Sequence, residues 1–132
     1  MASIFTKIIN NEIPARFVYK DEIVVSFLTI NPVTPGHVLV VPIKEFDHWV
    51  DLDEDILTHI MKVSKKISQA LMQCFDCERI GFEIAGFEVP HTHIHLIPAN
   101  SNLDMDLSRG DPTPSHEFMN AIQTKIVASL SK

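Results

Sequence analysis

The sequence has few of the features that mark secreted, membrane-bound or disulfide-stabilised proteins. Its 132 residues include two cysteines, Cys74 and Cys77, with no second pair to complete a C-x-x-C zinc site. We therefore expect two reduced thiols and a reducing compartment. The longest strongly apolar stretch, residues 38–43, is too short to span a bilayer. Residues 1–11 include Lys7 and lack the apolar core of a signal peptide, so the sequence predicts a cytoplasmic protein with no membrane partner.

Positive charge is also scarce. Eleven lysines and arginines stand against seventeen aspartates and glutamates, which gives a formal net charge of −6. This balance disfavours a nucleic-acid backbone or an anionic membrane as the main partner. It leaves a mononucleotide open, because backbone N–H groups and histidines can hold a single phosphate without a basic patch.

Internal repeats, low-complexity tracts and linkers are absent as well. A chain of 132 residues fits one domain and can bury a core without crosslinks. We therefore predict a single domain over residues 1–132, in which residues 99–132 form a C-terminal extension. Residues 99–114 carry the Asn, Asp, Gly and Pro typical of irregular structure.

Hydrophobic periodicity predicts short strands on either side of one long helix. The helix covers residues 51–75, where apolar residues recur at spacings of three and four. One or two helical turns are expected at 4–10, and a terminal helix at 115–130 that Ser115 could cap. The strands are expected at residues 17–20, 23–30, 37–42, 79–85 and 91–97, the last stopped by Pro98. This order indicates an antiparallel α+β fold.

The strand at residues 91–97 holds three histidines at alternate positions. Since side chains alternate across a strand, His91, His93 and His95 should share one face. Neutral imidazole is both a nucleophile and a proton shuttle near neutral pH. A phosphoryl or nucleotidyl group could therefore sit on one ring while a neighbouring ring protonates the leaving group.

The spacing alone leaves a metal site as an alternative. Imidazole is the commonest zinc ligand, and three histidines could bind zinc with water, His48 or a carboxylate. Burying three unpaired histidines without a function would be costly. A fourth histidine, His37, follows the loop at residues 31–36, and loops at strand ends often carry functional residues. A lone histidine at such a place is more often a surface residue.

The sequence His-Thr-His-Ile-His-Leu-Ile at residues 91–97 resembles the signature of the histidine-triad (HIT) family. Three further segments resemble the family in the same order along the chain. They are the opening at residues 4–15, the central block at 27–42 (FLTINPVTPGHVLVVP), and the loop before the triad at 85–90 (AGFEVP). Four such segments in order make the resemblance specific.

The resemblance implies a half-barrel of five antiparallel strands with a long helix, often paired as a homodimer through joined sheets. It implies hydrolysis or transfer at the α-phosphate of a purine nucleotide or nucleotide derivative, with no cofactor or metal required. A Hint-like nucleoside phosphoramidase is the leading expectation. The alternatives are a dinucleoside polyphosphate hydrolase and a non-catalytic nucleotide-binding module.

The resemblance also assigns roles to individual residues. His93 is the expected nucleophile, which forms a covalent nucleotidyl-histidine, and His95 contacts the phosphate and assists the leaving group. His37 completes the hydrogen-bonded histidine network, and His91 orients His93 mainly through its backbone carbonyl. The expected nucleotide-binding residues are Phe5, Ile8, Phe27, Leu28, Thr29, Ile30, Gly86 and Val89.

Some positions depart from the family pattern near the expected ligand. Thr29 stands where many members have an aspartate that accepts hydrogen bonds from the ribose, so ribose recognition should differ. Phe87 stands where glutamine is common, in a loop that is shorter than usual. Glu88 would repel a phosphate if its side chain points inward.

Another departure concerns a zinc site that some members carry. Ser3 and Thr6 stand where those members have cysteines, so we predict that this zinc site is absent. Separately, the usual histidine after the Val-Pro block is replaced within residues 43–46, and Lys44 there is expected to be a solvated lysine.

Overall fold

The computed structural model describes residues 2–132, so Met1 and the predictions that include it lie outside the described residues. Five strands form one antiparallel sheet in the order β1-β2-β3-β5-β4. The strands are β1 (Phe17–Lys20), β2 (Val24–Leu28), β3 (Val38–Pro42), β4 (Arg79–Glu83) and β5 (Ile94–Ala99). This confirms the predicted α+β fold with a five-stranded antiparallel sheet.

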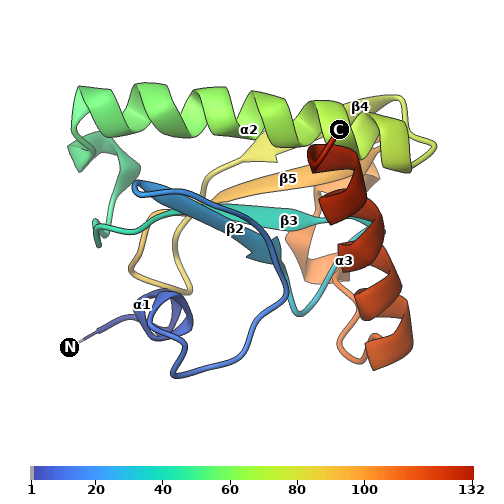
Figure 1. The fold of residues 1–132 in the computed structure, drawn as a ribbon, viewed down its shortest axis with the longest axis horizontal. Helices are drawn as coiled ribbons and strands as arrows, with labels where there is room; N and C mark the ends of the chain where they lie inside the picture. Colours follow the sequence, from blue (N-terminus) through green and yellow to red (C-terminus); the bar gives the residue numbers. More distant parts are fainter. Residues whose placement is uncertain (1) are drawn as a thin grey trace.

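Three α-helices surround the sheet (Figure 1). The long helix α2 (Glu54–Cys74) runs along one face, and the short helix α1 (Ile4–Ile9) lies on the other side. Helix α3 (His116–Leu130) stands at one end. Short 3-10 helices occupy Trp49–Asp51, Asn102–Met105 and Leu107–Arg109. Within residues 2–132, no helix has the length and apolarity needed to cross a membrane.

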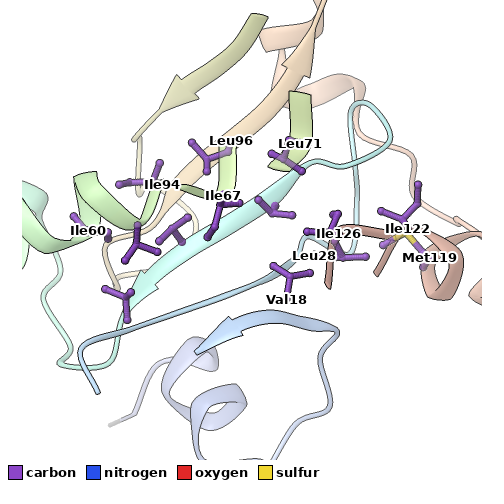
Figure 2. Close-up of a cluster of buried hydrophobic side chains, with 14 residues drawn as sticks. Val18, Leu28, Ile60, Ile67, Leu71, Ile94, Leu96, Met119, Ile122 and Ile126 are labelled. Carbon is purple, nitrogen blue, oxygen red and sulfur yellow. The ribbon is translucent and has the colours of Figure 1, made fainter. Parts of the chain in front are cut away.

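The main core lies between α2 and the sheet (Figure 2). The apolar stripe predicted for the long helix is buried, because residues three and four apart lie on one helix face. Its side chains pack against alternate residues of β3 and β5. Members from these three elements are Ile60, Val63, Ile67, Leu71, Val38, Val40, Ile94 and Leu96. Burying a large aliphatic side chain contributes roughly 1.5–3 kcal/mol, so this layer holds the sheet rigidly.

Helix α3 belongs to the same core. Its Met119, Ile122 and Ile126 are buried in the cluster that α2 forms with the sheet. Ser115 caps the helix as expected, since its hydroxyl accepts the N–H of Phe118 at 3.1 Å. The chain beyond residue 99 is therefore packed into the core rather than appended to it.

The other face of the sheet carries the candidate site. Cross-strand pairs Phe27–Leu39, Leu39–His95 and His95–Glu83 place these four residues in one row, and paired residues point to the same side. We call the side on which they lie the histidine face. Helix α1 covers part of it, because Phe5 packs beside Phe27.

The strand expected at residues 91–97 begins later than predicted. Strand β5 starts at Ile94, and β3 pairs with it only as far as Val40. Thr92 instead donates its N–H to the carbonyl of Phe46 at 2.6 Å. Strand β3 ends at Pro42, which has no N–H to continue a ladder. His91 and His93 therefore precede the strand.

The same strand also ends later than predicted, because Pro98 does not stop it. Strand β5 continues to Ala99, with Pro98 paired to Ile80 of β4. The Pro98 carbonyl accepts the Thr34 hydroxyl at 2.7 Å, on the side away from β4. The imide nitrogen faces that same side, so its missing N–H interrupts no bond to β4.

The remaining expected elements are present with shorter bounds. The strand expected at residues 23–30 covers Val24–Leu28, and the one expected at 79–85 ends at Glu83. The long helix starts at Glu54 rather than at residue 51, because Asp51 ends a 3-10 turn.

Candidate active site

The loop before β3 fixes the position and the tautomer of His37. Gly36 has φ +93°, and a Cβ atom there would lie 2.5 Å from the Phe75 ring, so only glycine fits. The Val33 N–H donates to Nδ1 of His37 at 3.1 Å, so the ring proton of His37 is on Nε2. That Nε2 lies 2.9 Å from Nδ1 of His95, to which it donates. His95 consequently keeps its own proton on Nε2.

His93 has the opposite tautomer. Its Nδ1 lies 2.8 Å from the backbone carbonyl of His91, which can only accept, so the proton is on Nδ1. The Nε2 of His93 therefore carries a free electron pair. The rings of His93 and His95 are 5.0 Å apart, and the Phe5 ring meets His93 edge-on at 4.8 Å. The site thus brings a nucleophilic nitrogen close to a ring that carries an Nε2–H donor.

His91 lies on the same side of the sheet as His93, because the Phe5 ring packs against both, with centroids 5.9 Å from His91 and 4.8 Å from His93. The His91 ring is fully buried, and both nitrogens have protein partners. Nε2 donates to the Pro42 carbonyl at 2.7 Å, and Nδ1 accepts from the Ser3 hydroxyl at 2.7 Å. The His91 ring therefore lies on the side of the sheet that alternation predicts, but it is covered and not open to a ligand. Its carbonyl, which accepts from His93, is the part of His91 that serves the site.

All four histidines are neutral near pH 7. Burial is the main cause, and repulsion from a neighbouring histidine the second, that together lower the pKa of His37 to about 3 and that of His95 to about 4. Burial also lowers the pKa values of His91 and His93. A neutral ring is the form of histidine that can attack phosphorus.

The buried histidines predict that acid weakens the fold. A ring that stays neutral when folded takes up its proton only on unfolding, so the unfolded state binds more protons below its pKa of 6.5. Stability should be greatest above that value and fall towards the folded pKa values of about 4 and about 3. Each such histidine changes the free energy of unfolding by about 1.4 kcal/mol per pH unit.

For His37 and His95 together, the free energy of unfolding should fall by about 3 kcal/mol between about pH 6.5 and about pH 5. Urea unfolding at the two pH values measures this change. The double variant His37→Gln, His95→Gln should show a much flatter dependence. Equal slopes for the variant and the parent protein would contradict neutral burial of these rings.

The expected nucleotide-binding residues do not all reach the histidine face. Phe5, Ile8 and Phe27 form one buried cluster there, and Val89 packs against it. Leu28 lies in the main core beneath α2 and α3, so the structure does not place its side chain in the site.

The other expected ligand contacts lie in loops. Thr29 is half-buried beside His37, to whose carbonyl it donates its N–H at 3.3 Å. Ile30 is 77% exposed and Phe87 is 98% exposed, so neither is packed in this structure. Gly86 has φ +83°, which its turn requires.

Two carboxylates lie near the histidines. Glu83 is the cross-strand partner of His95, and directly opposed side chains start about 5 Å apart. Burial is the main cause of the lowered pKa of His93. The negative charge of Glu88 raises that pKa in part, so Glu88 is close enough to act on the ring. Alternation along β4 and its pairing with β5 would have been enough to predict Glu83 on this face. The position of Glu88 could not be predicted in this way, because it depends on the conformation of the loop.

The two positions at which some family members have zinc-binding cysteines, Ser3 and Thr6, lie beside the His91 ring. Ser3, Thr6 and Glu45 surround the His91 ring and hydrogen bond to one another. Among residues 2–132, no three His, Cys, Asp or Glu side chains are grouped so that they could hold a metal ion. Cys74 and Cys77 are free thiols, and Lys44 is an exposed side chain 3.7 Å from Asp53.

Comparison with known proteins places this arrangement in a family. The family model described as the HIT domain matches residues 10–102. An uncharacterized HIT-like protein of Borreliella burgdorferi is 41% identical over 115 residues, which cover 82% of this chain and 83% of that protein. The adenosine 5'-monophosphoramidase of Saccharomyces cerevisiae is 34% identical over 98 residues, covering 74% of this chain and 62% of the yeast protein.

A solved structure agrees with these sequence matches. The crystal structure of a Hit-like protein from Bartonella henselae is 33% identical and has a TM-score of 0.82, covering 96% of this chain and 95% of the other. The resemblance first visible in the histidine segment thus extends over the whole sheet and its helices. The chain belongs to the HIT family.

Proposed function

We propose that the protein is a nucleotide hydrolase or transferase that acts at the α-phosphate through a covalent nucleotidyl-histidine on His93, with a nucleoside phosphoramidate as its substrate. The observation that carries the proposal is the tautomer of His93. Its proton is held by the His91 carbonyl at 2.8 Å, and its neutral Nε2 is free. The adenosine 5'-monophosphoramidase among the relatives supports the choice of substrate.

The proposed first step uses two rings. The electron pair on Nε2 of His93 forms a bond to phosphorus while the bond from phosphorus to the leaving nitrogen breaks. His93 becomes positively charged, and the hydrogen bond from Nδ1 to the His91 carbonyl stabilises that charge. His95, whose Nε2–H is directed outward by its bond to His37, gives that proton to the leaving nitrogen, which departs as an amine.

In the second step, water attacks the phosphorus and breaks its bond to His93, and one proton of the water returns to Nε2 of His95. The ring leaves neutral, since its proton stays on Nδ1, and the free Nε2 is restored. The net reaction consumes one water molecule for each phosphorus–nitrogen bond that is cleaved. The aromatic cluster of Phe5 and Phe27 lies beside the histidines and offers an apolar surface to the purine base.

The charge around the histidines favours an amine over a polyphosphate as leaving group. Glu83 and Glu88 are both acidic and lie on the side of the histidine face formed by β4 and the loop that follows it. A polyphosphate tail would be repelled by these carboxylates, whereas an amine would not. This observation favours the phosphoramidase over the dinucleoside polyphosphate hydrolase.

The proposal is tested by comparing kcat/KM for adenosine 5'-phosphoramidate and for a diadenosine polyphosphate with the same purified protein. The phosphoramidate should be the better substrate. A preference for the diadenosine polyphosphate would replace the proposal by its alternative. Tight binding of adenosine 5'-monophosphate without turnover of either compound would indicate a non-catalytic binding module.

The role of the carboxylates leads to a separate prediction. In Glu88→Gln, and also in Glu83→Gln, kcat/KM for the diadenosine polyphosphate should rise about threefold to tenfold, because one repulsive charge is removed. The value for the phosphoramidate should stay the same or fall. Glu117→Gln, an exposed change in the first turn of α3, is the matched control. An unchanged ratio between the two substrates in both variants would refute this selection by charge.

A further inference from the structure

The start of the chain is tied to the site through one carboxylate. Oε1 of Glu45, in the segment after β3, accepts the backbone N–H of Ser3 at 2.8 Å. The same oxygen accepts the hydroxyl of Thr6 at 2.7 Å. The N–H of Ser3 contributes most to lowering the pKa of Glu45, which is about 2, so this acceptor stays charged at neutral pH.

The directions of these hydrogen bonds determine where the Ser3 proton goes. The Thr6 hydroxyl proton is taken by Glu45, and the Ser3 oxygen already accepts the Thr6 N–H at 3.1 Å. The closest acceptor for the Ser3 hydroxyl is therefore Nδ1 of His91 at 2.7 Å, since the Thr6 oxygen lies 3.4 Å away. Nδ1 of His91 is thus kept unprotonated.

This contact decides the state of the whole His91 residue. With Nδ1 acting as acceptor, the ring proton is on Nε2 and binds the Pro42 carbonyl at 2.7 Å. The backbone N–H of His91 is held by the Val89 carbonyl at 2.8 Å. The ring and the N–H are both fixed, so the remaining polar group of His91, its carbonyl, points steadily at Nδ1 of His93.

Helix capping alone does not explain this arrangement. Ser3 is the N-cap of α1, and a cap needs only the bond from the Thr6 N–H to the serine oxygen. The additional bonds from Ser3 to His91 and from Thr6 to Glu45 connect segments that are far apart in the sequence. They also hold α1 in place, and with it the Phe5 ring that packs against His93.

We propose that Ser3, Thr6 and Glu45 are positioning residues of the histidine site, which fix the tautomer and carbonyl direction of His91 and thereby keep Nε2 of His93 free to attack. They touch no reacting atom, so they act only through His91 and α1. The structural part of the proposal is independent of the reaction, and its kinetic part rests on the proposed function.

The test reads the tautomers directly. In protein labelled with 15N-histidine, long-range proton–nitrogen spectra near neutral pH distinguish a proton on Nδ1 from one on Nε2. We compare the parent protein with Ser3→Ala, Glu45→Ala and Glu45→Gln. Glutamine keeps an oxygen where Glu45 has Oε1, so it can still accept from Ser3 and Thr6. Ser115→Ala is the matched control, because it removes the serine N-cap of α3 away from the site.

The parent protein and Ser115→Ala should show His91 protonated on Nε2 and His93 protonated on Nδ1. In Ser3→Ala and Glu45→Ala both rings should become mixtures of the two tautomers. With the phosphoramidate, kcat should fall about tenfold while KM changes little, and Glu45→Gln should recover most of the loss. If Ser3→Ala or Glu45→Ala does not fold, Glu45→Gln still tests the proposal. Its tautomer populations should differ slightly from those of the parent, whereas those of Ser115→Ala should not differ.

The proposal is overturned if the His93 tautomer and kcat are the same in Ser3→Ala and Glu45→Ala as in the parent. It is also overturned if the parent carries the His93 proton on Nε2. A different result would show that only the proposed function is wrong. In that case the parent would not turn over the phosphoramidate, but its tautomers and their change in Ser3→Ala would be as described.

Discussion

In His93→Ala, kcat/KM for the phosphoramidate should fall by at least about a thousandfold, because the variant has no nitrogen with which to form the covalent intermediate. His95 cannot replace it, since its Nδ1 is bound to His37 and its Nε2 carries a proton. His91 cannot replace it either, since both of its nitrogens are held by Ser3 and Pro42. The tautomers thus leave one candidate nucleophile among the histidines of the site.

The comparison needs a control for the loss of a histidine as such. His59 on α2 bonds the Asp21 carboxylate at 2.7 Å and takes no part in the histidine network. His59→Ala should therefore retain the parent kcat/KM. Removing the His93 ring also removes a buried hydrogen bond worth about 1 kcal/mol, so thermal melts must show that the variant is folded at the assay temperature. Turnover at the parent level in folded His93→Ala would rule out the mechanism.

Ile126→Ala should lower the free energy of unfolding by about 3–4 kcal/mol, because the side chain is fully buried in the main core and its removal leaves a cavity. The neighbouring Val127 is 40% exposed, so Val127→Ala should change stability by no more than about 0.5 kcal/mol. Urea unfolding followed by circular dichroism measures both. A single unfolding transition in the parent protein and in both variants would indicate that α3 unfolds together with the sheet.

The two stability changes show whether the residues beyond 99 are part of the domain or a loosely attached extension. If Ile126→Ala cost no more than Val127→Ala, α3 would be only loosely attached to the sheet. A separate early transition confined to Ile126→Ala would lead to the same conclusion. The buried contacts of Met119 and Ile122 with the sheet-facing core argue for attachment.

Much of the fold follows from periodicity. The stripe on α2 and the alternation in the strands could be read directly, because burial on one face leaves a repeat of three to four or of two residues. The ends of elements could not be read as well. Pro98 was expected to stop a strand, but whether proline does so depends on which neighbour faces its nitrogen, and the sequence does not show this.

The sequence was enough to predict which histidines form the candidate site, but not how their rings are arranged. The four histidines do come together, yet the His91 ring is covered by the start of the chain, where the Ser3 hydroxyl binds its Nδ1. Nothing in the sequence indicates that residues 3 and 91 touch. Leu28 is a different case, since it follows Phe27 in a strand and alternation already assigns the two to opposite faces.

Two further expectations stay predictions. No metal or cofactor is expected to be needed for the reaction. A homodimer is expected from the family resemblance, and β4 lies at the edge of the sheet where a second copy could pair. Partly exposed Trp49, Met61 and Phe82 line a hollow of about 260 Å³ beside that edge.

The central claim is that His93 carries the nucleotide covalently during turnover. Its most direct measurement is mass spectrometry of a His95→Asn variant mixed with adenosine phosphoramidate and quenched in base, followed by fragmentation of the peptide that contains residues 91–95. Bulk water can protonate the departing amine in this variant, but no ring remains to take a proton from the water that attacks the intermediate. The second step should therefore be the slower one, so a nucleotidyl group should accumulate, and fragmentation should place it on His93. The double variant His93→Ala, His95→Asn should carry none. An adduct on another histidine, or turnover in His95→Asn with no adduct at any time, would contradict the account.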